Sequence, residues 1–480
     1  MVKATYIRHP NPSMRGNPLI EGLGFPLSIS EVQKNCDVPF VDEVDLSDVP
    51  SDLHGYYTRS VLGNLFDTHV CQDEAAKIYE VLRHSIEDGY RHRNPLNPEL
   101  RRVLSAIEQD KAEPIQATNI DRLGLFDTAF SYLLCGLSGR GKTKMISMAL
   151  KQIEQVIEHT EYRVKGQEPI PLRFTQVTYI YIEHHDRKGQ KALLQSILEA
   201  IDKVTAEKYK YVNRKSTVSE LITAVRKAVI VHGIGTIIID EAQNFASSPV
   251  ELKIGTNEKT SMKFVEEIFN RIGASLIFVG TFSTLDLFSK EMTITRRTIR
   301  RGSLALASCD LNSSFWNRLC DRILHTGFMY NQVTPISTLK MHLHQRSAGI
   351  PAIAVSLVQA TLYYLTYMAP EQQDLSTHAI DHVFDEQFAL LRAPIDALNH
   401  GEYHRFEDLK PMLLLKESKP DYTQEGSLLL AAKKLESRLM QGAVELVQQK
   451  PNEKSHEVDA KKSSEALAPG ALMKTLGYGE

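Results

Sequence analysis

Residues 136–143 read GLSGRGKT, a phosphate-binding loop of the pattern G-x-x-x-x-G-K-[ST]. Its three glycines allow the backbone to curl, so that successive N–H groups face a single anion. Lys142 can then reach the β- and γ-phosphates of a nucleotide, and the hydroxyl of Thr143 can bind Mg²⁺. The residues predicted to bind ATP and Mg²⁺ are Gly136, Leu137, Ser138, Gly139, Arg140, Gly141, Lys142, Thr143, Lys144 and, further along the chain, Asp240.

The residues around this loop predict the two elements that such a loop connects. The apolar run 131–135 predicts a buried strand, and apolar residues at helical spacing predict a helix from Lys142 to about Glu158. A structural glycine turn is the alternative to a nucleotide site. The order of strand, loop and helix favours the nucleotide site.

A pair of carboxylates follows a second apolar run. Residues 236–239 are β-branched and end in Asp240 and Glu241. Asp240 is placed to hold Mg²⁺, and Glu241 is placed to orient and polarise the attacking water. Phosphoryl transfer needs mainly positioned groups and neutralised charge, so the pair favours ATP hydrolysis over passive nucleotide binding. For Asp240 alone, an acidic residue that merely ends a strand would be a sufficient explanation.

A third apolar run, 275–279, leads into Gly280 and Thr281. Because the carboxyl ends of parallel strands meet at one edge of a sheet, Thr281 is predicted to lie beside the phosphates. There its hydroxyl can bind the γ-phosphate or the attacking water. Thr281 is therefore assigned to the catalytic group with Glu241.

Four arginines lie within six residues after this strand, among them Arg297, Arg300 and Arg301. One interpretation is that they reach the nucleotide of a neighbouring subunit, and another is that they contact nucleic-acid phosphate. A solvated basic face is the third. Their place after the Thr281 strand favours the first interpretation, so all three residues are predicted to be catalytic.

The order of these motifs resembles that of the AAA+ ATPases, and within them the TnsC/TniB transposition regulators of Tn-seven-like mobile elements. Residues 15–23 resemble an Asn-Pro-x-Ile-Glu-Ala-Leu opening of that family, and residues 89–95 match a Gly-Tyr-x-x-Arg-Asn-Pro segment. Arg297 to Gly302 matches its arginine cluster, and residues 405–409 resemble a segment after its lid. The similarity covers roughly residues 10 to 410. The N-terminal segments are more specific to the family than the phosphate-binding motifs.

The resemblance implies an ATPase that forms a ring or filament, such as a hexamer or heptamer, on double-stranded DNA without sequence preference. It implies transposase subunits and a target-selecting protein as further partners. One departure is that many AAA+ lids carry an arginine after a glycine, whereas here none follows Gly349 and Arg346 precedes it. The departure puts the coupling of the lid to hydrolysis in doubt.

Two loops are rich in basic residues and suit contacts with DNA phosphates. A solvated loop is the alternative on composition alone, and the resemblance favours DNA because such loops line the pore of related rings. The candidate DNA-contacting residues are Arg187, Lys188, Lys191, Lys210 and Lys215.

The composition bounds these interpretations. The net charge of −3 excludes a uniformly basic DNA-coating protein, so contacts with DNA must be local. Five scattered cysteines without C-x-x-C spacing argue against a disulfide framework or zinc site and suit a reducing cytoplasm, which the resemblance implies is bacterial. No apolar run approaches the roughly 18 residues of a membrane span.

The predicted fold is α/β, an AAA+ P-loop NTPase with a parallel sheet. Residues 1–118 are an accessory region for partner contact, 119–305 the nucleotide-binding core, and 306–400 a small helical lid. Residues 401–480 are an extension, partly disordered and also for partner contact. Two other functions stay open. One is a helicase loader or origin-binding ATPase, and the other is a P-loop scaffold or signalling protein that does not bind DNA.

Overall fold

The structure is a computed structural model, and the chain divides into two compact units, Met1–Lys416 and Glu417–Glu480. All described residues belong to the first unit. They are 2–109, 130–163, 168–184, 190–207, 209, 216–245, 264, 267–268, 271–289, 292–325, 333–406, 409–410 and 412.

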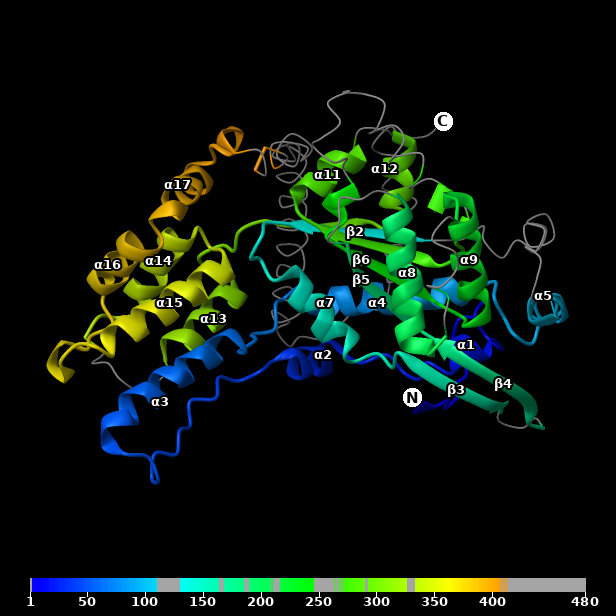
Figure 1. The fold of residues 1–480 in the computed structure, drawn as a ribbon, viewed down its shortest axis with the longest axis horizontal. Helices are drawn as coiled ribbons and strands as arrows, with labels where there is room; N and C mark the ends of the chain where they lie inside the picture. The colour runs from blue at the N-terminus through cyan, green and yellow to red at the C-terminus, as the bar shows by residue number, and fades with distance from the viewer. Residues whose placement is uncertain are drawn as a thin grey trace, which may run out of the picture. The chain divides into compact units, whose positions relative to one another are not determined.

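A parallel sheet of five strands forms the centre of this unit (Figure 1). The spatial order is β5 (Tyr179–Glu183), β6 (Thr236–Asp240), β7 (Ser275–Gly280), β2 (Ser131–Gly136) and β8 (Ser303–Leu306). The three predicted strands before the candidate site are thus present, and they are the three central ones. Because all five run in the same direction, their carboxyl ends share one edge.

Helices cover both faces of the sheet, as its continuous apolar strands require. In β6, Ile237 and Ile239 pack with helices α8 (Gln190–Thr205) and α9 (Val218–Val231). Ile238 points to the opposite face, where α4 (Ala75–Tyr90) and α7 (Lys142–Leu150) pack. The alternation along a single strand therefore builds two hydrophobic cores.

The helix after the phosphate-binding loop is shorter than its apolar spacing predicts. Helix α7 ends at Leu150, and strand β3 (Val156–Tyr162) begins where the helix was predicted to continue. The β-branched and aromatic run 177–182 predicts a single strand, but the structure divides it, because Val177 ends β4 (Ile170–Val177) and β5 begins at Tyr179. β3 pairs antiparallel with β4 and parallel with β1 (Val2–Lys3) in a second sheet. Val156 and Ile157 have β-branched side chains, which favour a strand over a helix at these positions.

The N-terminal region packs against two different cores. Its helices α1 (Pro18–Glu21), α2 (Ile29–Cys36) and α4 contribute to the apolar cluster under the central sheet. The segment with α3 (His54–Val61) and η2 (Leu62–Phe66) instead places Leu62 and Leu65 in the core of the C-terminal helices. The boundary predicted near residue 118 lies outside the described residues. Two further elements of this region are η1 (Ser51–Leu53) and α5 (Pro98–Gln109).

The C-terminal helices pack around one apolar core, and we call them the lid. Trp316 and Phe384 are fully buried at its centre. The helices of the lid are α13 (Ser314–Leu324), α14 (Ile336–Ser347), α15 (Pro351–Leu365), α16 (Thr377–Gln387) and α17 (Arg392–His400), with short η5 (Pro370–Gln372), η6 (Ala389–Leu391) and η7 (Tyr403–Arg405). Among the remaining described elements, η4 (Ala242–Phe245) follows β6, and α11 (Phe282–Ser289) and α12 (Met292–Thr298) follow β7.

Within the described ranges, no single helix is long and apolar enough to cross a membrane, although α14 and α15 pass that test as a pair bent by 117°.

Candidate nucleotide site at the carboxyl edge of the sheet

Three neighbouring strands deliver the predicted residues to one cavity. β2 ends in the phosphate-binding loop, β6 ends at Asp240, and β7 ends at Gly280. A cavity of about 510 Å³ lies at this edge. It is lined by Ser138, Gly139, Gly141, Lys142, Thr143, Lys144, Ser147, Glu241, Gly280, Thr281 and Ala352.

The backbone of the phosphate-binding loop requires its glycines. Gly139 and Gly141 have φ values of 76° and 93°, in the left-handed region that residues with a Cβ rarely adopt. Gly141 is also the N-cap of α7, so the positive end of the helix dipole faces the cavity. This curled backbone suits an anion such as a phosphate.

Lys142 is held beside the loop and close to both carboxylates. Its Nζ donates to the carbonyl oxygens of Gly136 and Leu137, at 3.0 and 2.9 Å. Burial lowers the pKa of the Lys142 ammonium, while Asp240 and Glu241 act in the opposite direction. A triphosphate at this position would supply further negative charge, which favours the charged ammonium.

Asp240 gathers two hydroxyl groups at one carboxylate oxygen. The hydroxyl of Thr143 donates to Asp240 Oδ2 at 2.7 Å, and that of Tyr181 donates to the same oxygen at 2.8 Å. Burial and the neighbouring Asp240 raise the pKa of Tyr181 well above its usual value, so the phenol stays a donor. Hydroxyl and carboxylate oxygens are the ligands that Mg²⁺ prefers. Thr143 and Asp240 therefore fit the predicted metal site.

Glu241 has a strained backbone and a held side chain. Its φ of 57° lies in the left-handed region, which costs a non-glycine residue roughly 1–2 kcal/mol. Its N–H donates to Asp240 Oδ1 at 2.8 Å. Its Oε2 accepts from the side-chain amide of Gln243. Such strain is found at functional sites, where the surrounding contacts maintain it.

Arg140 has its side chain directed away from the cavity. The guanidinium donates to the Gln72 amide oxygen at 2.5 Å and to the Ala307 carbonyl at 2.9 Å. It also pairs with Glu74 at 3.5 Å. Arg140 thus joins the phosphate-binding loop to the N-terminal region through Gln72 and Glu74. The loop residues that line the cavity are Ser138, Gly139, Gly141, Lys142 and Thr143.

The lid meets the cavity at the start of α15. The Ala352 N–H donates to the Gly139 carbonyl at 3.1 Å. Arg346, the arginine before Gly349, donates instead to Asp381 at 2.7 Å and stacks over the Phe384 ring. The lid therefore contacts the phosphate-binding loop through backbone atoms, and the arginine is engaged within the lid.

The arginine cluster lies at the opposite edge of the sheet. The Arg301 N–H donates to the carbonyl of Ser131, the first residue of β2, whereas the phosphate-binding loop follows the last. The length of β2 places the two edges roughly 17 Å apart. Arg301 pairs with the buried carboxylate of Asp88, and Arg300 lies exposed over the Phe130 ring. Arg297 occupies the last turn of α12, and its carbonyl accepts from Ser131.

Of the candidate DNA-contacting residues, only Lys191 is described, and it is exposed at the start of α8. Arg187, Lys188, Lys210 and Lys215 lie outside the described residues.

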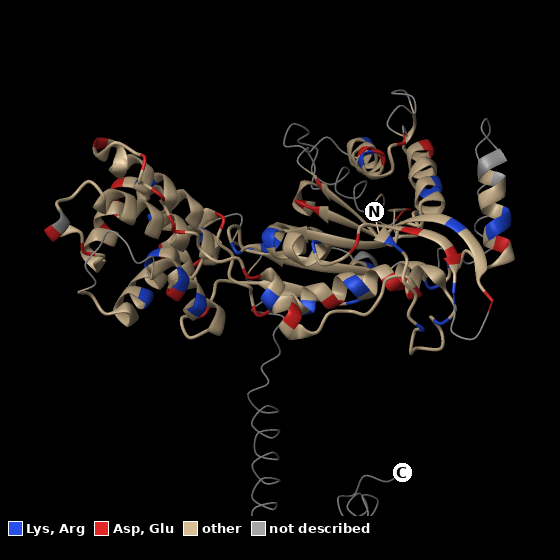
Figure 2. Cartoon of the chain, turned by 90° about the horizontal axis from the view of Figure 1, so that it is seen from below, with Lys and Arg blue, Asp and Glu red and all other residues tan. Residues whose placement is uncertain are grey.

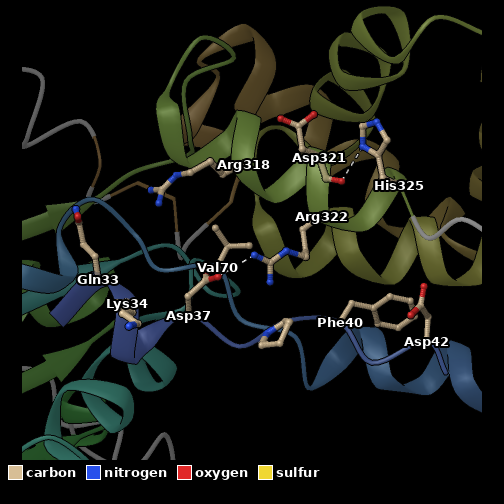
Figure 3. A pocket seen from close by; sticks show the side chains of 11 residues that line it. Gln33, Lys34, Asp37, Phe40, Asp42, Val70, Arg318, Asp321, Arg322 and His325 are labelled. Atoms are coloured by element: carbon tan, nitrogen blue, oxygen red, sulfur yellow. Dashed lines mark hydrogen bonds and ion pairs between the residues drawn. The ribbon is translucent and has the colours of Figure 1, made fainter. Parts of the chain in front are cut away.

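A second cavity, of about 670 Å³, lies between α2 with its following segment and α13 of the lid (Figure 3). Its main charged groups are paired, because Arg322 donates to Asp37 at 2.8 Å. Arg318 donates to Asp73 at 2.6 Å. These ion pairs join the N-terminal region to the lid. The described residues that line this cavity do not form a set typical of a catalytic site.

Sequence patterns missed several residues of the site. Tyr181 contacts the carboxylate of Asp240, Gln243 contacts that of Glu241, and Ser147, Gly280 and Ala352 line the cavity. Tyr181 was predicted only as part of a strand. The pairing of β5 with β6 would have indicated the contact of Tyr181 with Asp240, because Glu183 pairs with Asp240. Tyr181 lies two residues before Glu183 and therefore on the same face of the sheet. The other contacts depend on folding that no local pattern specifies.

Part of the chain is similar to known proteins. Residues 127–288 match the family model described as an AAA domain. Among solved structures, a Walker-type ATPase of Pyrococcus abyssi is 14% identical, with 70% of this chain and 88% of that chain covered and a TM-score of 0.34. The Aeropyrum pernix ORC2 protein is 14% identical, with 60% and 66% covered and a TM-score of 0.35. No curated protein matches the chain.

The family match and the sheet together confirm the predicted fold class. Residues 127–288 form an AAA-type P-loop ATPase domain with a parallel sheet.

Proposed function

We propose that this protein hydrolyses ATP with Mg²⁺ at the carboxyl edge of its sheet. The observation that carries the proposal is the convergence of Thr143, Asp240 and Glu241 beside Lys142. Thr143 and Asp240 would hold Mg²⁺, which when bound neutralises charge on the β- and γ-phosphates. Lys142 neutralises the same phosphates, Glu241 orients the attacking water, and Thr281 binds the γ-phosphate or that water.

We further propose that ATP binding drives assembly of the chain on duplex DNA, where it regulates a transposase together with a target-selecting protein in a bacterial cytoplasm. Support comes from the two N-terminal motifs that resemble transposition regulators. They lie in contact in the fold, since Asn17 donates to the Tyr90 carbonyl at 2.8 Å and Asn94 donates to the Gly16 carbonyl at 2.9 Å. Motifs far apart in sequence thus form one structural unit.

The charge distribution bears on how DNA would be held. On the described elements, Lys and Arg residues alternate with Asp and Glu residues (Figure 2). DNA contacts should therefore be few and local. The slope of log K against log salt concentration should shrink by about one unit for each phosphate contact removed.

Arg300 is the strongest candidate for the arginine that acts on a neighbouring subunit's nucleotide. The cluster lies at the edge opposite this chain's own cavity, so any nucleotide that it contacts belongs to another copy. Arg301 is engaged with Asp88, whereas Arg300 is exposed. A trans arginine is worth about 10³–10⁵ in rate in other phosphoryl-transfer systems.

The assembly is tested by a gel shift with random duplex DNA, with and without a non-hydrolysable ATP analogue. We expect a shift only with the analogue and none with the Lys142→Ala variant. Hydrolysis without any DNA binding would support a scaffold or signalling protein instead. Binding restricted to one sequence or dependent on a replicative helicase would support an origin-binding ATPase or a loader.

The trans arginine is tested by mixing two inactive variants, Arg300→Ala and Lys142→Ala. An intact loop from one chain then meets an intact arginine from the other, so part of the ATPase activity should return. Absence of recovery at every ratio, with co-assembly shown by pull-down, would contradict the trans role.

A further inference from the structure

Gln243 joins the ends of two strands at the candidate site. It lies in η4, two residues after Glu241, and its Nε2 donates to Glu241 Oε2. Its Oε1 accepts from the N–H of Thr281 at 3.1 Å and from the Thr284 hydroxyl at 3.4 Å. One amide therefore links the carboxylate after β6 to the first residue after β7.

The space around this amide is closed. A Cβ on Gly280 would lie 2.5 Å from Gln243 Oε1 and closer still to the Thr284 hydroxyl. Only glycine at position 280 leaves room for the amide in this position. The donors and acceptors also match in type, because the amide offers N–H to a carboxylate and a carbonyl oxygen to an N–H.

This arrangement decides which oxygen of Glu241 is available. Oε2 is held by Gln243, and Oε1 has no hydrogen-bond partner among the described residues. Glu241 itself faces the cavity together with Thr281. A water bound to Oε1 would consequently meet a carboxylate whose rotation is fixed by Gln243.

We propose that Gln243 is a positioning residue for ATP hydrolysis, which holds the Glu241 carboxylate in register with Thr281. The inference rests on the proposed ATPase function. Gln243 acts through Glu241 and Thr281, and the cavity lining does not include its own side chain. Misplacement of a reacting group by about 1 Å can cost about 100-fold in rate, so loss of this link should be visible in turnover.

Three variants separate the roles of the amide. Gln243→Glu keeps the shape but replaces the donor with a second carboxylate, Gln243→Leu removes both hydrogen bonds, and Gln243→Asn keeps the amide on a shorter side chain. Gln155→Glu is the matched control, because Gln155 is a half-buried glutamine outside the cavity lining that donates to the Tyr179 carbonyl at 3.3 Å.

The measurements are kcat and KM for Mg²⁺-ATP, and the Kd and number of binding sites for an ATP analogue. For Gln243→Glu and Gln243→Leu we expect kcat to fall about 10–100-fold with Kd within about twofold of wild type. We expect Gln243→Asn to retain more activity than either, and Gln155→Glu to match wild type.

The split between kcat and Kd distinguishes positioning from a structural role. Loss of the link should lower kcat while every molecule still binds the analogue with the wild-type Kd, and Gln243→Asn, which keeps the amide, should recover part of the rate. A purely structural role would lower kcat and the fraction of molecules that bind the analogue together, in proportion to the folded fraction.

The outcomes separate this inference from the proposed function. If the wild-type protein does not hydrolyse ATP, both fail. If the wild type hydrolyses ATP and Glu241→Gln does not, but the Gln243 variants match wild type in kcat, or lose kcat and analogue-binding sites in equal proportion, only the positioning role fails.

Discussion

The cavity edge and the N-terminal region differ in where their charged side chains find partners. At the cavity, Lys142, Thr143 and Glu241 converge on a space that a ligand can enter. In the N-terminal region, Glu21 and Arg93 are almost fully buried, and their charges are met by the protein's own atoms. The first set is arranged for a ligand, and the second is satisfied within the fold.

Arg93 illustrates the second arrangement. Its guanidinium donates to the carbonyls of Gly89, Val229 and Ile234 and joins the N-terminal region to the end of α9. Burial lowers its pKa to about 10. The difference between the regions shows that a motif that resembles a known family, here residues 89–95, can stabilise the fold without contacting the candidate site. The motif around residues 89–95 thus supports the arrangement of the domain more directly than its chemistry.

The largest effect should come from Lys142→Ala. Hydrogen bonds to charged groups contribute about 1.5–3 kcal/mol, so we expect the analogue to bind about 10–100-fold more weakly and hydrolysis to fall to background. The control is Lys151→Ala, at the C-terminal end of the same helix. Fluorescent-nucleotide titration measures the affinity. Equal affinity in the Lys142 variant would remove the loop from the site.

An intermediate effect, on stability alone, is expected for Arg93→Leu. The change removes the guanidinium from three carbonyl oxygens, of which Val229 keeps the N–H of Ile234, and should lower the free energy of unfolding by about 3 kcal/mol. Arg102→Leu, on the exposed face of α5, should change it by less than about 0.5 kcal/mol. Urea unfolding measures both. An Arg93 variant of wild-type stability but reduced ATPase activity would place this motif in the chemistry.

The smallest effect concerns pH. Burial, with Lys144 nearby, lowers the pKa of His69 from 6.5 to about 4. The unfolded chain then binds a proton that the folded chain excludes, so stability is lost as the pH falls from about 6.5 to about 4. His69→Leu should flatten this dependence by about 1–2 kcal/mol, as measured by urea unfolding at several pH values. A dependence identical to wild type would show that the pKa of His69 is the same in the folded and unfolded chain.

Much of the cavity edge could be predicted because its residues follow strands directly. The register of β2, β6 and β7 brings the loop, Asp240 and Thr281 together once the sheet is parallel. Gln243 and Tyr181 could not be assigned, because their contacts depend on the left-handed backbone at Glu241 and on the β5–β6 pairing.

The N-terminal region was predicted as a separate accessory region. No sequence pattern indicated that its segments would pack into two different cores. The segment that packs on the lid and the segments that pack on the sheet are both ordinary amphipathic stretches. The engagement of Arg301 with Asp88 likewise joins residues more than two hundred positions apart. Long-range pairing of this kind is set by the whole fold and not by local spacing.

The most direct test of this account compares Glu241→Gln with Glu21→Gln. Both exchange a carboxylate for an amide, but Glu21 accepts from the N–H groups of His9 and Gly16 and from the Tyr162 hydroxyl. Single-turnover ATP hydrolysis and urea unfolding are measured on both variants. We predict that Glu241→Gln slows hydrolysis about 10²–10⁴-fold at unchanged stability. Glu21→Gln should lose about 1–3 kcal/mol of stability at unchanged hydrolysis rate in the folded protein. Wild-type hydrolysis by the Glu241 variant, or slowed hydrolysis by a fully stable Glu21 variant, would contradict the account.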